Sequence, residues 1–324
     1  MRNLILTLFL ILSVVLTGCD GEKSQKSLIL YSELDPKFTF EMVRTFMKSS
    51  RDDKFLIKVI YELRDDGPKP DIVLAERRTL NGLVIDGKLK PTKFKKGNEL
   101  PLGFRESDGH WYGIFYDPAV FLVNQNYART VGQNAISKWA DLQNLPQPRI
   151  CIENLSNSIS SQNFLGSMAD NMGEQTSITY LWNLNRFVSD YTNFPFSTVR
   201  KTAVGDTDIS ITRQSFVFKY LESKFPAYIV VPEEGTPINL YGMGLFKDCA
   251  NEEKAHIFMN WMMTSGDMQS FSQQMLSGYE FLFSYEGKLK DTNKLWLNNS
   301  YMLWKDQEEL TNRWLDMVRF SNKR

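Results

Sequence analysis

Short apolar runs that read as strands alternate along this chain with stretches whose apolar residues recur at helical spacing. The strand-like runs cover residues 28–32, 56–61, 71–74, 149–152, 208–211 and 228–231. After the first of them, Phe40, Val43 and Met47 recur with the period of one helix face. Residues 111–124 hold two further strand-like pieces, broken at Asp117-Pro118. Alternation of this kind predicts an α/β fold with largely parallel sheets.

The body of the chain, residues 28–324, is long enough for about two domains. Apolar residues make up 42% of the sequence and aromatic residues 13%, which is enough for well-filled cores. Lysine plus arginine and aspartate plus glutamate are equal at 38 each, so the formal net charge is zero. This balance argues against a nucleic-acid partner, because general nucleic-acid binding needs a basic patch.

A targeting segment precedes this body. Met1-Arg2-Asn3 gives a short positive start, residues 4–16 are almost wholly apolar, and Gly18-Cys19 follows. The apolar run is shorter than the roughly 20 residues that a membrane-spanning helix needs. The pattern predicts a signal peptide over residues 1–18 and resembles the lipobox of bacterial lipoproteins. That resemblance implies cleavage before Cys19, lipidation of Cys19 and a polar tether over residues 19–27. A plain signal peptide or an N-terminal membrane helix is the alternative.

The chain offers little material for a metal centre or for catalysis. His110 and His256 are its only histidines, and no Cys/His spacing of a metal site occurs. Cys151 lies in a strand-like run and Cys249 in a partly polar stretch. A disulfide between them is permitted outside the cytoplasm, although nothing in the sequence brings them together. The region around Ser167 lacks the G-x-S-x-G pattern of a nucleophile elbow. We therefore expect no metal, no cofactor and no enzymatic activity.

Five stretches carry a resemblance to a known family. They are Leu30-Tyr31-Ser32; residues 69–73 (KPDIV) with the helix end at 83–89; residues 108–113 (DGHWYG) with 120–124 (VFLVN); residues 137–142 (SKWADL); and residues 234–239 (EGTPIN) with 242–245 and 255–261. In this order and spacing they resemble the motifs of bacterial solute-binding proteins that serve ABC importers. The most similar group includes the ferric-iron, thiamine, polyamine and phosphonate binders.

The resemblance implies a type II periplasmic-binding-protein-like fold, with a ligand cleft between two α/β lobes. We expect one lobe over residues 28–117 plus 228–284 and the other over 118–227 plus 285–324. The implied function is capture of a small polar or anionic solute and its delivery to an ABC import permease. The protein would be a monomer outside the cytoplasm, held at the membrane by its lipid, on the periplasmic face of the inner membrane in a Gram-negative host. The alternative is a lipoprotein of the same fold that acts as a sensor or surface interaction protein without transport.

Polar residues in the turns after strands are the candidate ligand contacts, because ligands of open α/β sheets sit beyond the carboxyl ends of the strands. The candidates are Tyr31, Ser32, Arg77, Asn157, Ser158, Thr212, Arg213 and Tyr241. Each also has a structural alternative, since serine and asparagine commonly form turns and helix caps and tyrosines line cores. Arg213 is the strongest candidate, because a guanidinium after a buried strand needs a partner and clamps carboxylate or phosphate through two hydrogen bonds. An inter-lobe salt bridge is its alternative role.

One departure from the family pattern bears on the ligand. In the ferric-iron members, a strand like that at residues 208–212 leads into a pair of tyrosines that bind the metal. The matching positions in this chain are Ser215 and Phe216. Neither residue suits ferric iron, a hard cation that favours anionic oxygen ligands. The sequence therefore predicts that this protein does not bind ferric iron tightly.

Overall fold

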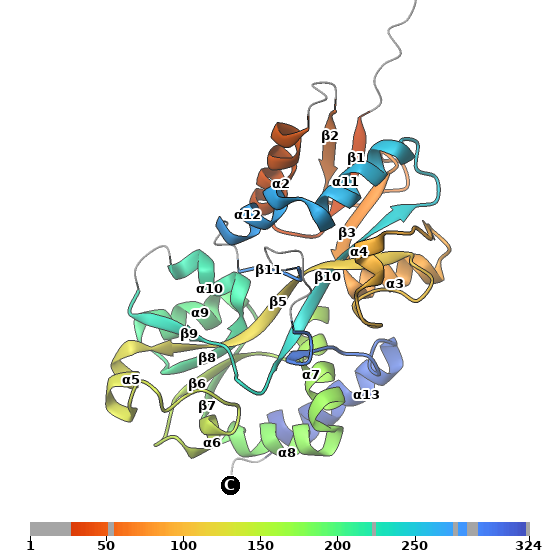
Figure 1. The fold of residues 1–324 in the computed structure, drawn as a ribbon. Coiled ribbons are helices and arrows are strands. Elements are labelled where there is room, and N and C mark those ends of the chain that lie inside the picture. Colours follow the sequence, from red (N-terminus) through yellow and green to blue (C-terminus); the bar gives the residue numbers. More distant parts are fainter. Residues whose placement is uncertain (1–26, 51–54, 222–224, 275–277, 284–290, 322–324) are drawn as a thin grey trace, which may run out of the picture.

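The structure is a computed structural model that describes residues 27–50, 55–221, 225–274, 278–283 and 291–321. Its two lobes are connected by strands that pass from one to the other (Figure 1). Neighbouring strands follow the order β2 (Ile57–Ile60), β1 (Leu28–Ser32), β3 (Ile72–Glu76), β10 (Thr236–Phe246), β5 (Trp111–Asn124), β8 (Ile209–Arg213), β6 (Ile150–Glu153) and β7 (Val188–Thr192). The expected two-lobed α/β fold is confirmed. The predicted signal peptide, and all of the predicted tether except Ser27, lie outside the described residues.

The first lobe is built on three parallel strands. β1 (Leu28–Ser32) pairs with β2 (Ile57–Ile60) on one side and with β3 (Ile72–Glu76) on the other. α2 (Pro36–Ser49) begins at Asp35, whose carboxylate accepts hydrogen bonds from two N–H groups of the first turn. The other elements of this lobe are α3 (Arg77–Ile85), β4 (Leu89–Lys90), α4 (Lys95–Asn98), α11 (Glu252–Thr264), α12 (Gly266–Gln274) and β11 (Glu280–Phe281).

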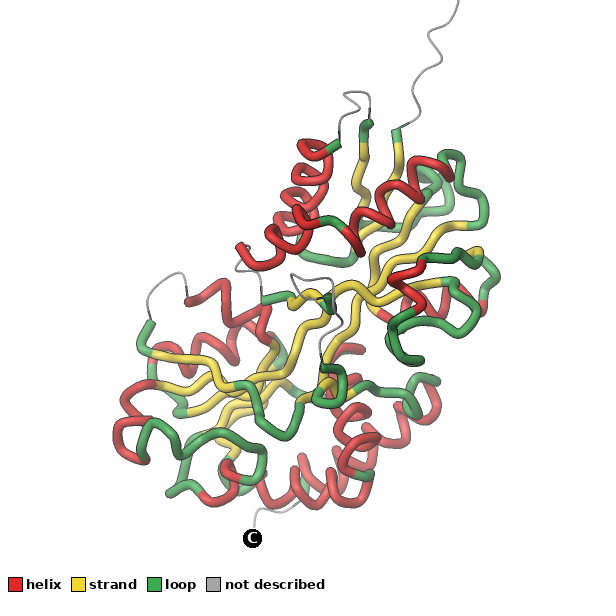
Figure 2. The backbone as a smooth tube through the Cα atoms, viewed as in Figure 1, coloured by secondary structure: helices red, strands yellow, loops and turns green. Residues whose placement is uncertain are grey.

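Two long strands belong to both lobes, and we call them the crossing strands. β5 (Trp111–Asn124) and β10 (Thr236–Phe246) pair antiparallel, and Figure 2 shows both running unbroken between the lobes. The predicted break at Asp117-Pro118 is wrong. The ladder between β5 and β10 ends at Pro118, and the ladder between β5 and β8 (Ile209–Arg213) begins at Ala119. Pro118 lies where β5 changes its partner from β10 to β8. A missing backbone N–H is tolerated at this point, so β5 continues through the proline.

The second lobe continues the sheet beyond β8. β6 (Ile150–Glu153) pairs parallel with β8 and with β7 (Val188–Thr192), while β9 (Ala227–Val230) pairs antiparallel with the end of β5. The remaining elements are α5 (Gln125–Val131), α6 (Asp141–Asn144), α7 (Ile159–Met172), α8 (Glu174–Asn185), α9 (Pro195–Val204), α10 (Gln214–Leu221), β12 (Leu295–Trp296), α13 (Trp304–Trp314) and the π-helical turn η1 (Leu315–Arg319).

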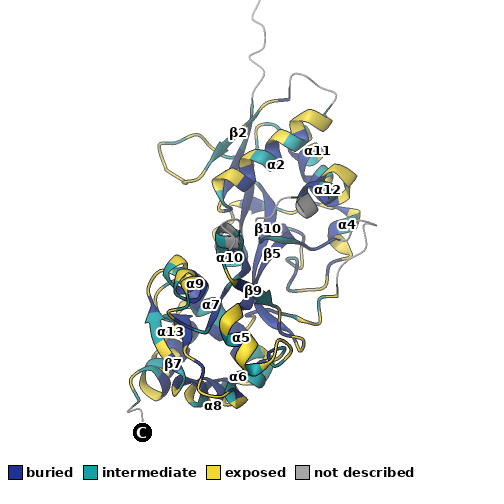
Figure 3. Ribbon diagram, turned by 90° about the vertical axis from the view of Figure 1, so that its left-hand side faces the viewer, coloured by how far each residue is buried: buried dark blue, intermediate teal, exposed yellow. Residues whose placement is uncertain are grey.

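Each lobe has its own apolar core, and the crossing strands β5 and β10 are buried along nearly their whole length (Figure 3). The boundaries predicted for the two lobes stay a prediction. Because β9 pairs with the end of β5, we propose that residues 228–235 belong to the second lobe. Trp314 of α13 is fully buried in the second core, so this helix is docked on the body. None of the helices in the described ranges is long and apolar enough to span a membrane.

Candidate ligand-binding site at the crossing strands

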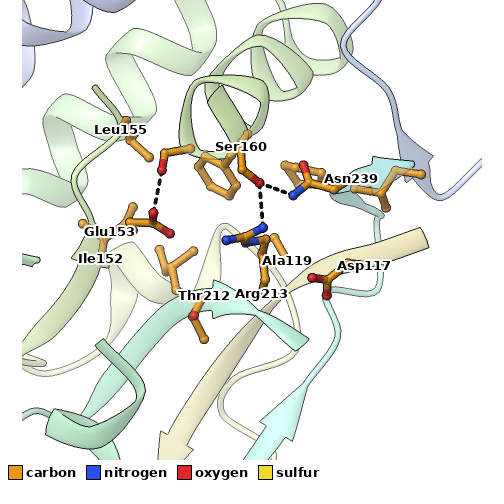
Figure 4. Close-up of a pocket in the computed structure, with 14 residues that line it drawn as sticks. Asp117, Ala119, Ile152, Glu153, Leu155, Ser160, Thr212, Arg213 and Asn239 are labelled. Atoms are coloured by element: carbon orange, nitrogen blue, oxygen red, sulfur yellow. Dashed lines mark hydrogen bonds between the residues drawn. The ribbon is translucent and has the colours of Figure 1, made fainter. Parts of the chain in front are cut away.

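A small cavity lies where the crossing strands enter the second lobe (Figure 4). Its volume is about 30 Å³, roughly the room that two water molecules need. The walls come from the ends of β6 and β8, the first turn of α7 and the crossing strands. The lining residues are Asp117, Ala119, Ile152, Glu153, Leu155, Ser160, Ser161, Phe164, Ile211, Thr212, Arg213, Pro237, Ile238 and Asn239.

Arg213, the last residue of β8, projects its guanidinium into this cavity (Figure 4). Its Nη1 donates a hydrogen bond to Ser160 Oγ at 2.7 Å, and its Cζ lies 4.3 Å from the centre of the Phe216 ring. Burial by itself lowers the pKa of Arg213, but the Asp117 carboxylate and other nearby acidic groups outweigh that effect and raise the pKa. The side chain is therefore a fixed positive charge at the junction of the lobes.

The first turn of α7 is tied to crossing strand β10 by side-chain amides. Asn239 Nδ2 donates to Ser160 Oγ, the same atom that accepts from Arg213. Asn163 Nδ2 donates to Asn239 Oδ1 at 2.8 Å and to the Ile238 carbonyl at 3.1 Å. Ser160 and Asn163 are not among the residues predicted from the sequence, which places Asn239 only at the end of the EGTPIN motif.

Asp117 holds the start of α10 against crossing strand β5. It is 1% exposed, and its Oδ1 and Oδ2 accept hydrogen bonds from the Ser215 backbone N–H and hydroxyl. The Ser215 hydroxyl is thus engaged within the protein. The neighbouring Phe216 ring packs against Arg213 and, at 5.0 Å between ring centres, against Phe196. Ser215 and Phe216 occupy the positions that hold the tyrosine pair in the ferric-iron binders. Ser215 is hydrogen-bonded at the start of α10, and the Phe216 ring packs against Arg213.

Two further polar groups of the cavity come from the ends of β6 and β8. Glu153 is 9% exposed, and its Oε1 accepts a hydrogen bond from Ser161 Oγ at 2.7 Å. Thr212 is 5% exposed, and its hydroxyl has no hydrogen-bond partner within the described part of the chain. Thr212 was among the predicted contacts, whereas Glu153 was not, because a glutamate that ends a strand carries no motif.

Two acidic side chains mark the adjoining edge of the first lobe. Glu33 Oε1 accepts from the Tyr31 and Thr79 hydroxyls, both at 2.9 Å, and Glu33 Oε2 accepts from the Glu76 backbone N–H. Burial raises the pKa of Glu76 to about 7, which the charge of Arg213 opposes and that of Glu33 reinforces. Tyr241 lies opposite Glu76 in the neighbouring strand, and the centre of its ring lies 5.6 Å from the centre of the Tyr279 ring. Tyr31 and Tyr241 are both buried, at 8% and 6% exposed.

The other predicted contacts do not line the cavity and already have partners. Ser32 Oγ shares a hydrogen bond with Thr39, and Arg77 donates to the Asn298 carbonyl and to Asn299 Oδ1. Asn157 donates to the Asn193 carbonyl, while Ser158 caps α7 by accepting from the Ser161 N–H. Of the eight predicted residues, the structure brings Thr212 and Arg213 together at the cavity.

Both cysteines of the folded body are free, so the disulfide left open by the sequence is not formed. Cys151 is buried in β6, while Cys249 donates from its thiol to Asp71 Oδ1 at 3.3 Å. Burial raises the pKa of each thiol to about 12. Neither sulfur is therefore a thiolate at neutral pH, which suits a structural role.

Among the described residues, one group of side chains has ligand atoms close enough together for a metal ion, namely Glu106, Asp108 and His110. It lies in the turn before β5, away from the cavity. Glu106 Oε2 already accepts from the backbone N–H groups of Asp108 and His110 and lies 2.9 Å from His110 Nδ1. Burial opposes ionisation, but these hydrogen bonds prevail and lower the pKa of Glu106 to about 2. The carboxylate closes a turn, which explains the cluster without a metal.

Two α/β lobes connected by crossing strands, with a polar cavity at their junction, define a two-lobed binding protein of the periplasmic type. The chain belongs to the family of bacterial extracellular solute-binding proteins, whose model matches residues 67–313. These are the type II solute-binding proteins of ABC importers, as the resemblance in the sequence implied. The family is extracytoplasmic, and its members are binding proteins.

Individual relatives show which cargoes this fold is associated with. Iron uptake protein A1 of Synechocystis sp. is 23% identical over 292 residues, covering 81% of this chain and 77% of its own. Ferric iron-binding protein A of Mannheimia haemolytica, in an open conformation, superposes with a TM-score of 0.70 at 18% identity, covering 91% of this chain and 99% of its own. The periplasmic binding protein AfuA of Actinobacillus pleuropneumoniae, with fructose-6-phosphate bound, gives a TM-score of 0.66 at 18% identity, with the same coverage. At this identity the two structures establish the fold alone.

Proposed function

We propose that this protein captures a small polar or anionic organic solute at the crossing strands, with Arg213 as its charged contact. This proposal is based on the hydrogen bonding of the Arg213 guanidinium. Within the described part of the chain, Ser160 is the only hydrogen-bond partner of the Arg213 guanidinium, so its other N–H groups are available to a ligand. A guanidinium in a partly buried site binds carboxylate or phosphate strongly. The bound sugar phosphate of AfuA is a solute of this kind.

Binding requires the lobes to move. The cavity of about 30 Å³ accepts a single small group but not a whole organic solute. The crossing strands β5 and β10 connect the lobes, and hinge closure of two domains around a ligand is a common mechanism. The solute would enter while the lobes are apart and be enclosed as they close.

The same proposal covers delivery and location. A lipid on Cys19 would hold the protein at the outer side of the membrane, where it would pass its solute to an ABC permease as a monomer. We propose an organic cargo rather than ferric iron, since Ser215 is bonded to Asp117 and Phe216 packs against Arg213. The protein would carry no catalytic activity and no cofactor.

The test is a thermal-shift screen of anions, amines, thiamine-like compounds and metals on the purified soluble body, followed by X-ray scattering with the best solute. A ligand that binds only the folded state raises the melting temperature. We expect an organic anion or zwitterion to do so and to make the protein more compact. Stabilisation by ferric iron alone would overturn the proposal. A stabilising solute that causes no compaction would instead favour the sensor or surface-interaction function.

A further inference from the structure

Glu153 and Arg213 face each other across the cavity without forming an ion pair (Figure 4). Both lie in the second lobe, at the ends of the neighbouring parallel strands β6 and β8. Building on the proposed function, we infer that the solute is a zwitterion, with a cationic ammonium group that contacts Glu153 and an anionic group that contacts Arg213. The inference concerns the class of solute, and it makes Glu153 the residue that selects that class.

The first observation is the half-satisfied carboxylate of Glu153. Its Oε1 accepts from Ser161 Oγ at 2.7 Å and lies 3.5 Å from Ser158 Oγ. Its Oε2 accepts no hydrogen bond from the described residues and stays open to the cavity, although the residue as a whole is 9% exposed. A buried carboxylate is costly unless its charge is paired. In Figure 4 the carboxylate is turned toward the cavity, which is where a cationic partner would sit.

The second observation is the fit of the space itself. The cavity has room for a group of about two water molecules, which matches an ammonium group with its first methylene. The buried Thr212 hydroxyl, without a partner in the described chain, offers a further hydrogen-bond acceptor in the same wall. An ammonium group has three donors. Glu153 and Thr212 would satisfy two of them.

The charge balance of the junction favours a cation over a neutral hydroxyl. Besides Glu153, the electrostatic neighbours of Arg213 include the carboxyl groups of Asp117 and Glu76. Glu33 also acts on Glu76 and raises its pKa, while Arg78 acts on it in the opposite direction. Arg77 already donates hydrogen bonds to Asn298 and Asn299. Several carboxyl groups thus surround Arg213, so a solute that carries a positive group as well as a negative one suits this junction.

Glu153 also has a purely structural explanation, since it orients the serines at the start of α7. The experiment separates the two roles with Glu153→Gln, which keeps the shape and the acceptor for Ser161 but removes the charge. Glu309→Gln is the matched control, because it removes one exposed charge of the same lobe outside the cavity. Three pairs of small probes differ only in their ammonium group: phosphoethanolamine and ethyl phosphate, taurine and ethanesulfonate, β-alanine and propionate.

Binding of each probe is followed by NMR titration of the wild type and of both variants. We expect at least one zwitterion to bind the wild type about tenfold or more tightly than its matched anion. Glu153→Gln should abolish that preference by weakening the zwitterion and leaving the anion equal or tighter, while Glu309→Gln keeps it. A structural role alone would weaken both members of a pair equally.

The outcomes distinguish this inference from the function on which it rests. If anions bind but no zwitterion exceeds its matched anion, the inference is wrong and the proposed function stands. A screen hit without a cationic group that binds more tightly than every zwitterion overturns the inference as well. If no probe binds and no organic solute of the thermal-shift screen stabilises the protein, the proposed function fails with it.

Discussion

Asp117 accepts two hydrogen bonds from Ser215, one from the backbone N–H at 3.0 Å and one from the hydroxyl at 2.6 Å. These two hydrogen bonds connect the start of α10 to crossing strand β5. Asp117→Ala should lower the free energy of unfolding by about 2–4 kcal/mol, because it leaves the Ser215 N–H buried without a partner. Ser215→Ala loses only the hydroxyl bond and should cost about 1–2 kcal/mol. Urea denaturation of both variants measures the difference, and equal losses would contradict this account.

Arg213 is expected to dominate the affinity for the solute. Arg213→Ala should weaken binding by about 10- to 150-fold without unfolding the protein, since a charge-assisted hydrogen bond contributes roughly 1.5–3 kcal/mol. Arg213→Lys should restore only part, because a point charge cannot reproduce the planar fork. Calorimetric titration with the solute from the screen measures both. Arg186→Ala is the matched control, since Arg186 also stacks on a phenylalanine, Phe187, but lies outside the cavity. Unchanged affinity in Arg213→Ala would remove Arg213 from the site.

Ferric iron should form no coloured complex with this protein. Tyrosinate ligands give ferric proteins a visible charge-transfer band, and the positions in question hold Ser215 and Phe216. We expect a flat visible spectrum when ferric citrate is added to the purified protein. A tyrosinate–iron band that grows to one equivalent would show that other residues supply the ligands.

Glu76 should make the protein less stable as the pH rises toward neutrality. Burial raises its pKa from the ordinary 4.5 to about 7, so between these values the folded state binds more protons than the unfolded state. Stability contributed by that proton is therefore lost as the pH rises from 4.5 through 7. The melting temperature of the wild type should fall over this range relative to that of Glu76→Gln. Parallel pH profiles of the two proteins would exclude Glu76 as the titrating group.

Cys19 should carry the membrane anchor. Cys19→Ala is expected to abolish lipidation and to leave either an uncleaved precursor or a released protein, because stable anchoring requires several acyl chains. Cell fractionation together with labelling by a radioactive fatty acid tests both. A processed Cys19→Ala protein that still fractionates with the membrane would refute the lipid anchor.

The fold could be predicted from the sequence because its strands are short, apolar and separated by helical stretches. The ends of those strands also located part of the cavity, since Thr212 and Arg213 close β8. Arg77 and Asn157 follow strands too, but local partners engage them. Polar residues after strands are used equally for caps and for ligands, and only the three-dimensional contacts tell these uses apart.

The rest of the cavity could not be predicted, because it is assembled from distant parts of the chain. Ser160 and Asn239 are 79 positions apart and meet only because β10 crosses from one lobe to the other beside α7. Glu153 is not part of any sequence motif, and its role depends on the cavity that its carboxylate faces. The apparent break at Asp117-Pro118 misled for a related reason: whether a proline interrupts a strand depends on which strands flank it.

The strand order also determines when the first lobe can be completed. In the sheet, β10 lies between β3 and β5, so residues 236–246 must be inserted between segments that precede them by more than a hundred positions. Most strands of the second lobe lie between them in the chain and could pair earlier, whereas α13 follows β10. Until β10 arrives, β3 and β5 would expose unpaired edges, which favour aggregation. A protein exported before it folds would therefore be most vulnerable until residues 236–246 have crossed the membrane.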